Sequence, residues 1–132
     1  MDIKFEKTKT DILAWSIEDT ISLFFVYSFV EQNYHDENLE LIKITSFAII
    51  KNLLEKEFVK AGDLLADNTF IPWKMAINEI IDKIKQDWEN LGRELEMYEL
   101  VWFEITIKGR REFEYLNSLP ELKESDPFYS DE

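Results

Sequence analysis

A wide apolar stripe in the middle of the chain constrains the fold more than any other feature of the sequence. Between Lys74 and Leu91 the apolar residues recur at helical spacing, and polar and charged residues fill the opposite face. Leaving five such side chains in water would forfeit roughly 1.5 to 3 kcal/mol each. We therefore expect a helix here that packs back on the protein core. The packing residues would be Ile77, Ile80, Ile81, Ile84 and Trp88.

Helical spacing also predicts the elements that precede the stripe. Ser16 followed by Asp19 is typical of a helix N-terminus, which predicts a first helix over residues 17–31. Residues 39–57 keep a helical period, but Thr45 and Ser46 interrupt it with capping side chains. This segment is therefore either one long helix or a short helix, a tight turn and a second helix.

Two segments rich in β-branched and aromatic residues predict strands. Residues 58–65, FVKAGDLL, should form one strand, with Gly62 as a bend or bulge. Residues 98–107 should form the other. Between them we expect a short link at residues 70–73, then the helix of the apolar stripe, which Gly92 should end in a left-handed cap.

The C-terminal part should hold one more helix and a tail. Lys108–Gly109–Arg110 is expected to turn the chain into a final helix that carries Phe113 and Leu116. Residues 120–132, PELKESDPFYSDE, contain two prolines and five acids against one lysine. Such a composition does not compensate the entropy of ordering, so we expect a frayed acidic tail.

The closing segment ITIKGRREFEYL, residues 105–116, resembles the end of many bacterial winged-helix proteins, where a strand finishes in Leu-Thr-x-x-Gly-Arg and enters a helix. Ile105, Thr106, Gly109 and Arg110 match, with Ile in place of the usual Leu. LIKITSFAIIKNLLEKEFVKAGDL, residues 41–64, resembles a helix-turn-helix unit that runs into the first wing strand. A further pattern is similar to that of a group of small uncharacterised bacterial proteins. It consists of Gly62–Asp63–Leu64, Ile71–Pro72–Trp73, Trp88, Leu91–Gly92–Arg93 and Val101–Trp102–Phe103.

The resemblance implies a mostly helical α+β fold with a winged-helix-like core of three helices and a short antiparallel sheet. Residues 1–119 would form one domain. The whole chain, with the tail, has 132 residues, a length that is typical of a single domain. Residues 66–99 would be a helical insertion in the wing, and a helix would follow the last strand. The four tryptophans should lie mostly in the core, with one or two at a surface rim.

Composition excludes most catalytic chemistry. The absence of cysteine rules out disulfides, zinc ribbons, iron–sulfur clusters and thiol nucleophiles. His35 is the single histidine, whereas a zinc site generally needs three or four ligands and a nucleophilic triad needs a placed base. Three glycines provide no phosphate-binding loop. We therefore expect no enzyme activity, no cofactor and no metal.

Charge points to the kind of partner. The chain has 28 acidic and 15 basic residues, a net charge of −13, which repels nucleic acids and anionic membranes and favours a basic protein. Residues 21–30 form the most hydrophobic run, about half the ~20 residues needed to cross a bilayer. The N-terminal residues MDIKFEKTKTD have mixed charge and no apolar stretch, so we expect a cytoplasmic protein.

The leading hypothesis is a non-catalytic domain of the immunity or antitoxin type, which would cover the basic active site of a toxin, with a nuclease as the first candidate. Asp63 is the first acid to consider, although it is also a candidate Asx-turn acceptor. The candidate partner-binding residues are Asp63, Asp67, Glu55, Glu57, Phe128 and Tyr129. The sequence does not distinguish a monomer from a homodimer.

The alternative is a winged-helix transcription regulator that binds DNA. Residues 45–58 would then be the recognition helix, and residues 108–111 would belong to the wing. The candidate DNA-binding residues are Lys51, Lys56, Lys108, Arg110 and Arg111. Acidic residues are interspersed among these basic ones. The number of basic residues is therefore barely enough for the roughly six phosphate contacts of an ordinary DNA-binding module.

Overall fold

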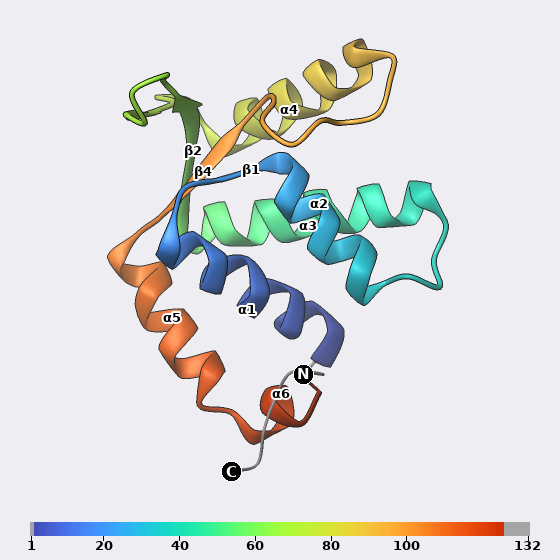
Figure 1. Cartoon of the computed structure of the whole chain (residues 1–132), viewed down its shortest axis with the longest axis vertical. Coiled ribbons are helices and arrows are strands. Elements are labelled where there is room, and N and C mark those ends of the chain that lie inside the picture. The colour runs from blue at the N-terminus through green and yellow to red at the C-terminus, as the bar shows by residue number, and fades with distance from the viewer. Residues whose placement is uncertain (1, 126–132) are drawn as a thin grey trace.

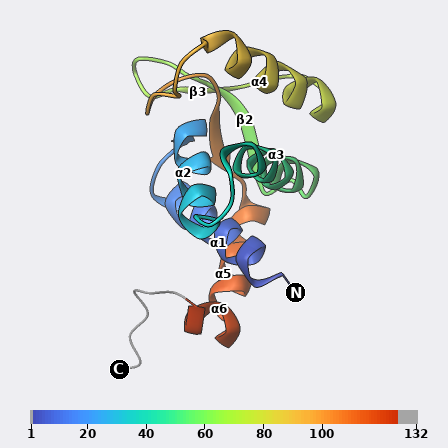
Figure 2. The same cartoon turned by 90° about the vertical axis from the view of Figure 1, so that its right-hand side faces the viewer.

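The part of the chain that the computed structural model describes, residues 2–125, is mostly helical with one small antiparallel sheet. This confirms the expected α+β class. Helices α1, α2 and α3 form the middle of the molecule, with α4 at one end and α6 at the other (Figure 1, Figure 2). In chain order the elements are α1 (Ile3–Glu18), β1 (Ile21–Ser22), α2 (Leu23–Asn33), α3 (Leu39–Glu55), β2 (Val59–Leu64), β3 (Phe70–Pro72), α4 (Ile77–Leu91), β4 (Trp102–Ile105), α5 (Ile107–Asn117) and α6 (Pro120–Ser125).

The sheet has the strand order β1-β4-β2-β3, and every neighbouring pair is antiparallel. Phe103 of β4 lies opposite Ala61 of β2 on one side and Ile21 of β1 on the other. Gly62 is in regular register with Trp102, so it forms no bulge. A side chain at Gly62 would overlap the Ile71 carbonyl of β3. The glycine therefore permits a close approach of β3 instead of a bend.

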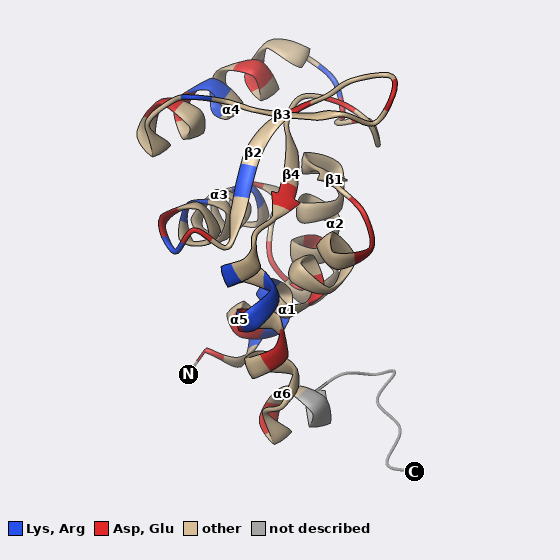
Figure 3. Ribbon diagram, turned by 90° about the vertical axis from the view of Figure 1, so that its left-hand side faces the viewer, with Lys and Arg blue, Asp and Glu red and all other residues tan. Residues whose placement is uncertain are grey.

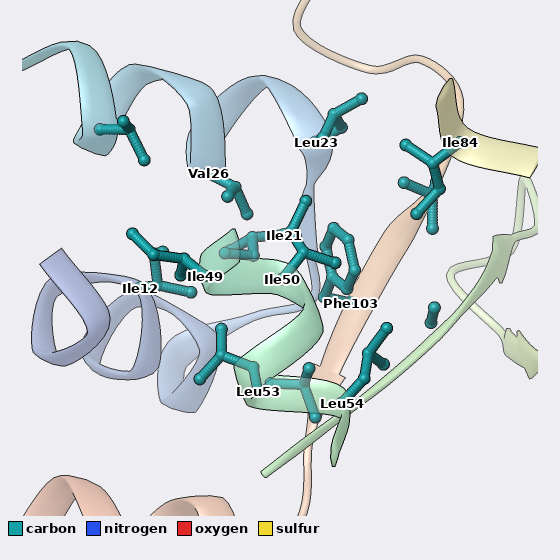
Figure 4. Packing of buried hydrophobic residues seen from close by; sticks show 14 of the residues in the cluster. Ile12, Ile21, Leu23, Val26, Ile49, Ile50, Leu53, Leu54, Ile84 and Phe103 are labelled. Carbon is teal, nitrogen blue, oxygen red and sulfur yellow. The ribbon is translucent and has the colours of Figure 1, made fainter. Parts of the chain in front are cut away.

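The core lies where α1, α2 and α3 pack against β4 and α4 (Figure 4). Ile12 of α1, Val26 of α2 and Ile49 of α3 are fully buried there, together with Phe103. The segment predicted over residues 39–57 contains one helix, α3, which ends at Glu55; Ser46 lies inside it and its hydroxyl donates to the Ile42 carbonyl at 2.8 Å. Within residues 2–125, none of the helices combines the length and apolar character that a membrane span requires.

The helix predicted from the apolar stripe is present as α4, and it packs on the core as expected. Ile80, Ile81, Ile84 and Trp88 are buried, and Ile77 is partly buried. Gly92 ends the helix in the left-handed conformation, with a φ of 63°. The helix begins at Ile77, three residues later than predicted, and the expected link at 70–73 contains the edge strand β3.

The N-terminal part contradicts the expected first helix over residues 17–31. Ser16 caps no helix start, because it lies inside α1 and its hydroxyl donates to the Ile12 carbonyl at 2.7 Å. After α1 the chain forms β1, and α2 begins only at Leu23. The break follows from the pairing of Ile21 with Phe103, a contact with a distant segment that local spacing does not contain.

The C-terminal part also differs from the prediction. Residues 108–110 form no turn, since α5 already begins at Ile107. Thr106 is its N-cap and accepts from the Gly109 backbone N–H at 3.0 Å. The predicted strand over residues 98–107 is reduced to β4, because a loop occupies 92–101. Helix α6 lies within the segment expected to fray, and residues 126–132 lie outside the described part.

Candidate functional site

A groove of about 450 Å³ lies where the end of α1, strand β1 and the β2–β3 turn meet. Trp15 of α1 and Phe25 of α2 line it together with two residues of the C-terminal half, Tyr98 and Trp102. Glu18 and Asp19, at the end of α1, supply its charge. We call this site the aromatic groove, defined by Trp15, Glu18, Asp19, Phe25, Tyr98 and Trp102.

Two pairs of stacked rings line the aromatic groove. The ring centroids of Trp15 and Phe25 are 6.2 Å apart, and those of Tyr98 and Trp102 are 5.9 Å apart with an interplanar angle of 7°. Trp15 is nevertheless 55% exposed and Tyr98 71% exposed. Each stack therefore presents aromatic surface to solvent, and such adjacent apolar surface is characteristic of interaction sites.

The loop that carries Tyr98 is held by an ion pair. The Arg93 guanidinium donates to both carboxylate oxygens of Glu99, and the Glu96 backbone N–H donates to the same group. These hydrogen bonds lower the pKa of Glu99 from 4.5 to about 2. The Ser22 hydroxyl of β1 donates to the Met97 carbonyl, which ties the loop to the sheet edge. Both sequence neighbours of Tyr98, Met97 and Glu99, are therefore anchored by hydrogen bonds.

The two carboxylates of the aromatic groove lack a cation. Glu18 is the last residue of α1 and Asp19 is its C-cap, where the helix dipole disfavours negative charge and no basic residue occupies the last turn. Among the described residues, Asp19 accepts only from the neighbouring Thr20 N–H, at 2.8 Å. In the described part of the chain neither group takes part in an ion pair.

A second acidic hollow, of about 650 Å³, lies between α2, α3 and the end of α4. Its lining includes Glu31, Glu40 and Glu94 but only one basic residue, Lys43. Burial raises the pKa of the Tyr27 phenol in this hollow, and the charges of Glu31 and Glu94 raise it further. Three carboxylates against one lysine give the lining of the hollow a net negative charge.

The two hollows adjoin at the first turn of α2. Phe24 lines the second hollow and Phe25 lines the aromatic groove, and their rings meet edge to face at 5.8 Å. The loop at 92–101 also contributes to both hollows. We call the carboxylates of the two hollows the acidic face. It consists of Glu18, Asp19, Glu31, Glu40 and Glu94.

The structure does not bring the sequence-predicted acids together. Glu55 ends α3 and lies 3.8 Å from Lys51, and the Glu57 carboxylate lies 3.4 Å from Lys108. Asp63 and Asp67 are at the opposite end of β2. The predicted residues Phe128 and Tyr129 lie outside the described residues.

The Asx turn is made by Asp67 and not by Asp63. Asp63 is an exposed residue of β2 opposite Ile71. Asp67 accepts from the Thr69 backbone N–H at 3.0 Å, and its hydrogen bonds to Thr69 lower the pKa of the Asp67 carboxyl. Leu64 and Asn68 line the aromatic groove, so both predicted acids of this region, Asp63 and Asp67, are next in sequence to a residue of this site.

The predicted DNA-binding residues are divided between two elements. Lys51 and Lys108 are engaged with Glu55 and Glu57. Lys56 caps the end of α3, and Arg110 and Arg111 are exposed on α5, which Figure 3 shows as a short basic segment. These last three residues have no ion pair within residues 2–125. Of the two elements, α5 therefore carries the two adjacent arginines, and Glu57 neutralises Lys108 in its first turn.

None of the residues of the aromatic groove was predicted to bind a partner. The tryptophans were expected mostly in the core, but only Trp88 is buried, whereas Trp73 and Trp102 are partly exposed. The expectation of a tryptophan at the surface rim is confirmed for Trp15. The one local signal was the pair Glu18–Asp19, which follows Trp15 by one turn of helix without a compensating cation.

The described side chains offer binding chemistry, with carboxylates and aromatic rings as the recognition groups. His35 is exposed and lies 3.3 Å from Asp36. Among residues 2–125 no group of three or more histidine, aspartate or glutamate side chains could hold a metal ion. Comparison of the chain with family models, curated protein sequences and solved structures finds no match.

Proposed function

We propose that this chain is a non-catalytic, acidic protein-binding domain of the immunity or antitoxin type, which neutralises a basic toxin by covering its active site. The observation that carries the proposal is the acidic face, where five carboxylates in two adjoining hollows are accompanied by a single lysine. A nuclease presents lysine and arginine to the phosphates of its substrate, so a nuclease is the toxin that fits best. Such a toxin acts on nucleic acid inside the cell, which places the proposed action in the cytoplasm.

The exposed rings favour a protein over a small cation as the partner. Interfaces concentrate their binding energy in aromatic and arginine anchors surrounded by polar groups. Trp15 and Tyr98 are such anchors, and Glu18 and Asp19 are the polar groups beside them. The net charge of −13 would speed the encounter with a basic surface and select against acidic partners.

We also propose that the fold is winged-helix-like. The order α1, β1, α2, α3, β2, β4 and the neighbouring strands β1-β4-β2 support this proposal. DNA binding has less support, because α4 lies along α3 and shares with it a hollow of about 520 Å³. The face of α3 beside this hollow carries Ile44, which is 57% exposed, and Lys51, which is engaged with Glu55. A recognition helix needs a free face with polar groups for bases and phosphates.

Co-expression with the protein encoded by the adjacent gene tests the proposal. If that protein is a toxin, its expression alone should stop growth of the host, and this chain should restore growth. The purified pair should bind much more tightly at about 50 mM than at about 500 mM salt, because the shorter Debye length screens the acidic face. A complex indifferent to salt, or no protection, would overturn the proposal.

Two variants with equal charge separate the acidic face from net charge. Glu31→Gln/Glu40→Gln/Glu94→Gln neutralises three carboxylates of the second hollow. The control Glu79→Gln/Glu89→Gln/Glu114→Gln neutralises three exposed carboxylates on α4 and α5. The first variant should weaken toxin binding at least about tenfold and the control less than about threefold. Equal losses would mean that binding does not use the acidic face.

A further inference from the structure

Two of the four tryptophans make a cation–π contact with a lysine of this chain. Lys43 Nζ lies 4.3 Å from the centroid of the Trp88 ring, and Lys83 Nζ lies 5.0 Å from that of Trp73. The other two tryptophans, Trp15 and Trp102, line the aromatic groove. Within residues 2–125 no cation lies over either of these rings. Indole attracts cations more strongly than the other aromatic side chains do. Trp15 and Trp102 are therefore the two indole rings at which a cation from a partner can bind.

The carboxylates of the groove also lack a cationic partner. Glu18 and Asp19 sit at the negative end of the α1 dipole without a basic residue in the last turn. The three other hollows that we compare with it differ in this respect, because each is lined by at least one lysine. A cation in the aromatic groove must therefore come from outside the described part of the chain.

An arginine side chain can bind the free aromatic rings and the unpaired carboxylates at the same time. Its planar guanidinium stacks on an aromatic face while its N–H groups donate to a carboxylate in a fork. A lysine ammonium is compact and strongly hydrated, so it gains less from a partly open aromatic site. The exposed rings of Trp15 and Tyr98 supply stacking surface, and Glu18 and Asp19 supply acceptors in the same groove.

We propose that the aromatic groove binds an arginine side chain of the basic partner protein. The guanidinium stacks on Trp15 and Tyr98 and donates to Glu18 and Asp19. This inference rests on the proposed function, because it names the group of the partner that the acidic face recognises. It assigns the stacked rings to affinity and the carboxylates to selectivity for arginine over neutral side chains.

A peptide titration tests the site without knowledge of the toxin. The probe is a short peptide in which glycine and serine flank the sequence Arg-Gly-Arg, and its twin carries lysine in place of arginine. The readout is the four indole N–H signals of the isotope-labelled full chain. The arginine peptide should move the signals of Trp15 and Trp102, while Trp73 and Trp88 serve as internal controls because their rings hold lysines. Equal movement of all four signals, or no movement, would overturn the inference.

The lysine twin should bind at least about threefold more weakly. Equal binding of the two peptides would contradict the choice of arginine. The variant Trp15→Ala/Tyr98→Ala should weaken binding of the arginine peptide about tenfold, and so should Glu18→Gln/Asp19→Asn. The second variant changes only exposed groups, so it keeps the test valid if the first one unfolds.

Matched controls lie on other elements. Tyr115→Ala removes a comparably exposed ring of α5, and Glu89→Gln/Glu114→Gln removes the same charge as the groove variant. Both should bind the arginine peptide within about twofold of the parent chain. If the toxin binds groove variants as tightly as the parent chain, the arginine site is wrong and the proposed function stands. If the peptide binds in the groove but no toxin is neutralised, the proposed function is wrong and the site stands.

Discussion

The guanidinium of Arg93 holds the carboxylate of Glu99 through two hydrogen bonds, of 2.8 and 2.7 Å. This contact lowers the pKa of Glu99 to about 2, below its ordinary value of 4.5. A carboxyl group whose pKa falls on folding stabilises the protein above its unfolded pKa and loses that contribution as the pH drops towards the folded value. The window for Glu99 therefore extends from pH 4.5 down to about 2.

The first prediction concerns Glu99→Gln. Its free energy of unfolding should be below that of the parent chain at neutral pH, and the difference should shrink as the pH falls through this window. Urea unfolding at several pH values measures it. Glu96→Gln is the control, because its carboxylate lies 3.8 Å from Arg93 and is far more exposed. A difference that does not change with pH would contradict the prediction.

Trp88→Ala should cost about 3 to 5 kcal/mol of stability. Trp88 is 7% exposed and meets Tyr27, Phe47 and Lys43 at the junction of α2, α3 and α4. Trp15→Ala should change the free energy of unfolding much less, since Trp15 is 55% exposed. Urea denaturation of both variants gives the comparison. Equal losses would mean that our distinction between a core tryptophan and a surface tryptophan is wrong.

Gly109→Ala should destabilise the chain by about 2 kcal/mol or more. The added methyl group would overlap the Phe58 carbonyl and crowd Ile105, because α5 starts against the beginning of β2. Gly92→Ala meets no neighbouring atom but must keep a φ of 63°, which costs about 1 kcal/mol. The melting temperature of Gly109→Ala should therefore be lower than that of Gly92→Ala. The reverse order would refute this account of the two glycines.

Duplex DNA should not be retarded by this protein in a gel at about 50 mM salt, whatever its sequence. If DNA were bound, Arg110→Ala/Arg111→Ala would flatten the salt dependence by about one unit for each lost phosphate contact. The double variant thus decides between a specific basic patch and incidental binding. A retarded complex that loses affinity in this variant would restore the alternative of a DNA-binding regulator.

Helix α4 was predictable because all the information lies within its own segment. Its apolar residues repeat at helical spacing around Ile80 and Ile84, and Gly92 follows as the cap. Helix α1 was missed because it buries polar residues that a hydrophobic pattern does not detect. Thr8 is buried where it accepts a hydrogen bond from Asn33 of α2, and Lys9 is buried where it pairs with Glu112 of α5. Both contacts join distant segments.

The aromatic groove was not predictable for a similar reason. Trp15 and Glu18 come from the first helix, Asn68 from the β2–β3 turn and Tyr98 from the loop before β4. Their proximity depends on the pairing of β1 with β4 and on the Arg93–Glu99 contact that shapes the loop. Composition gives the net charge of −13, but only the fold determines which carboxylates lie beside exposed rings.

The ion pair between the buried Lys9 and the partly buried Glu112, 3.0 Å long, joins α1 to α5 and bears on the order of folding on the ribosome. Helix α1 packs on α2, which follows it closely in sequence, but it packs equally on α5 and also on α6, and the strand that follows it pairs with β4. During synthesis α1 and β1 therefore lack a large part of their native neighbours until α5 has left the exit tunnel. Folding should consequently be a late, all-or-none step, and nascent chains that stop before α5 should remain open to protease in α1.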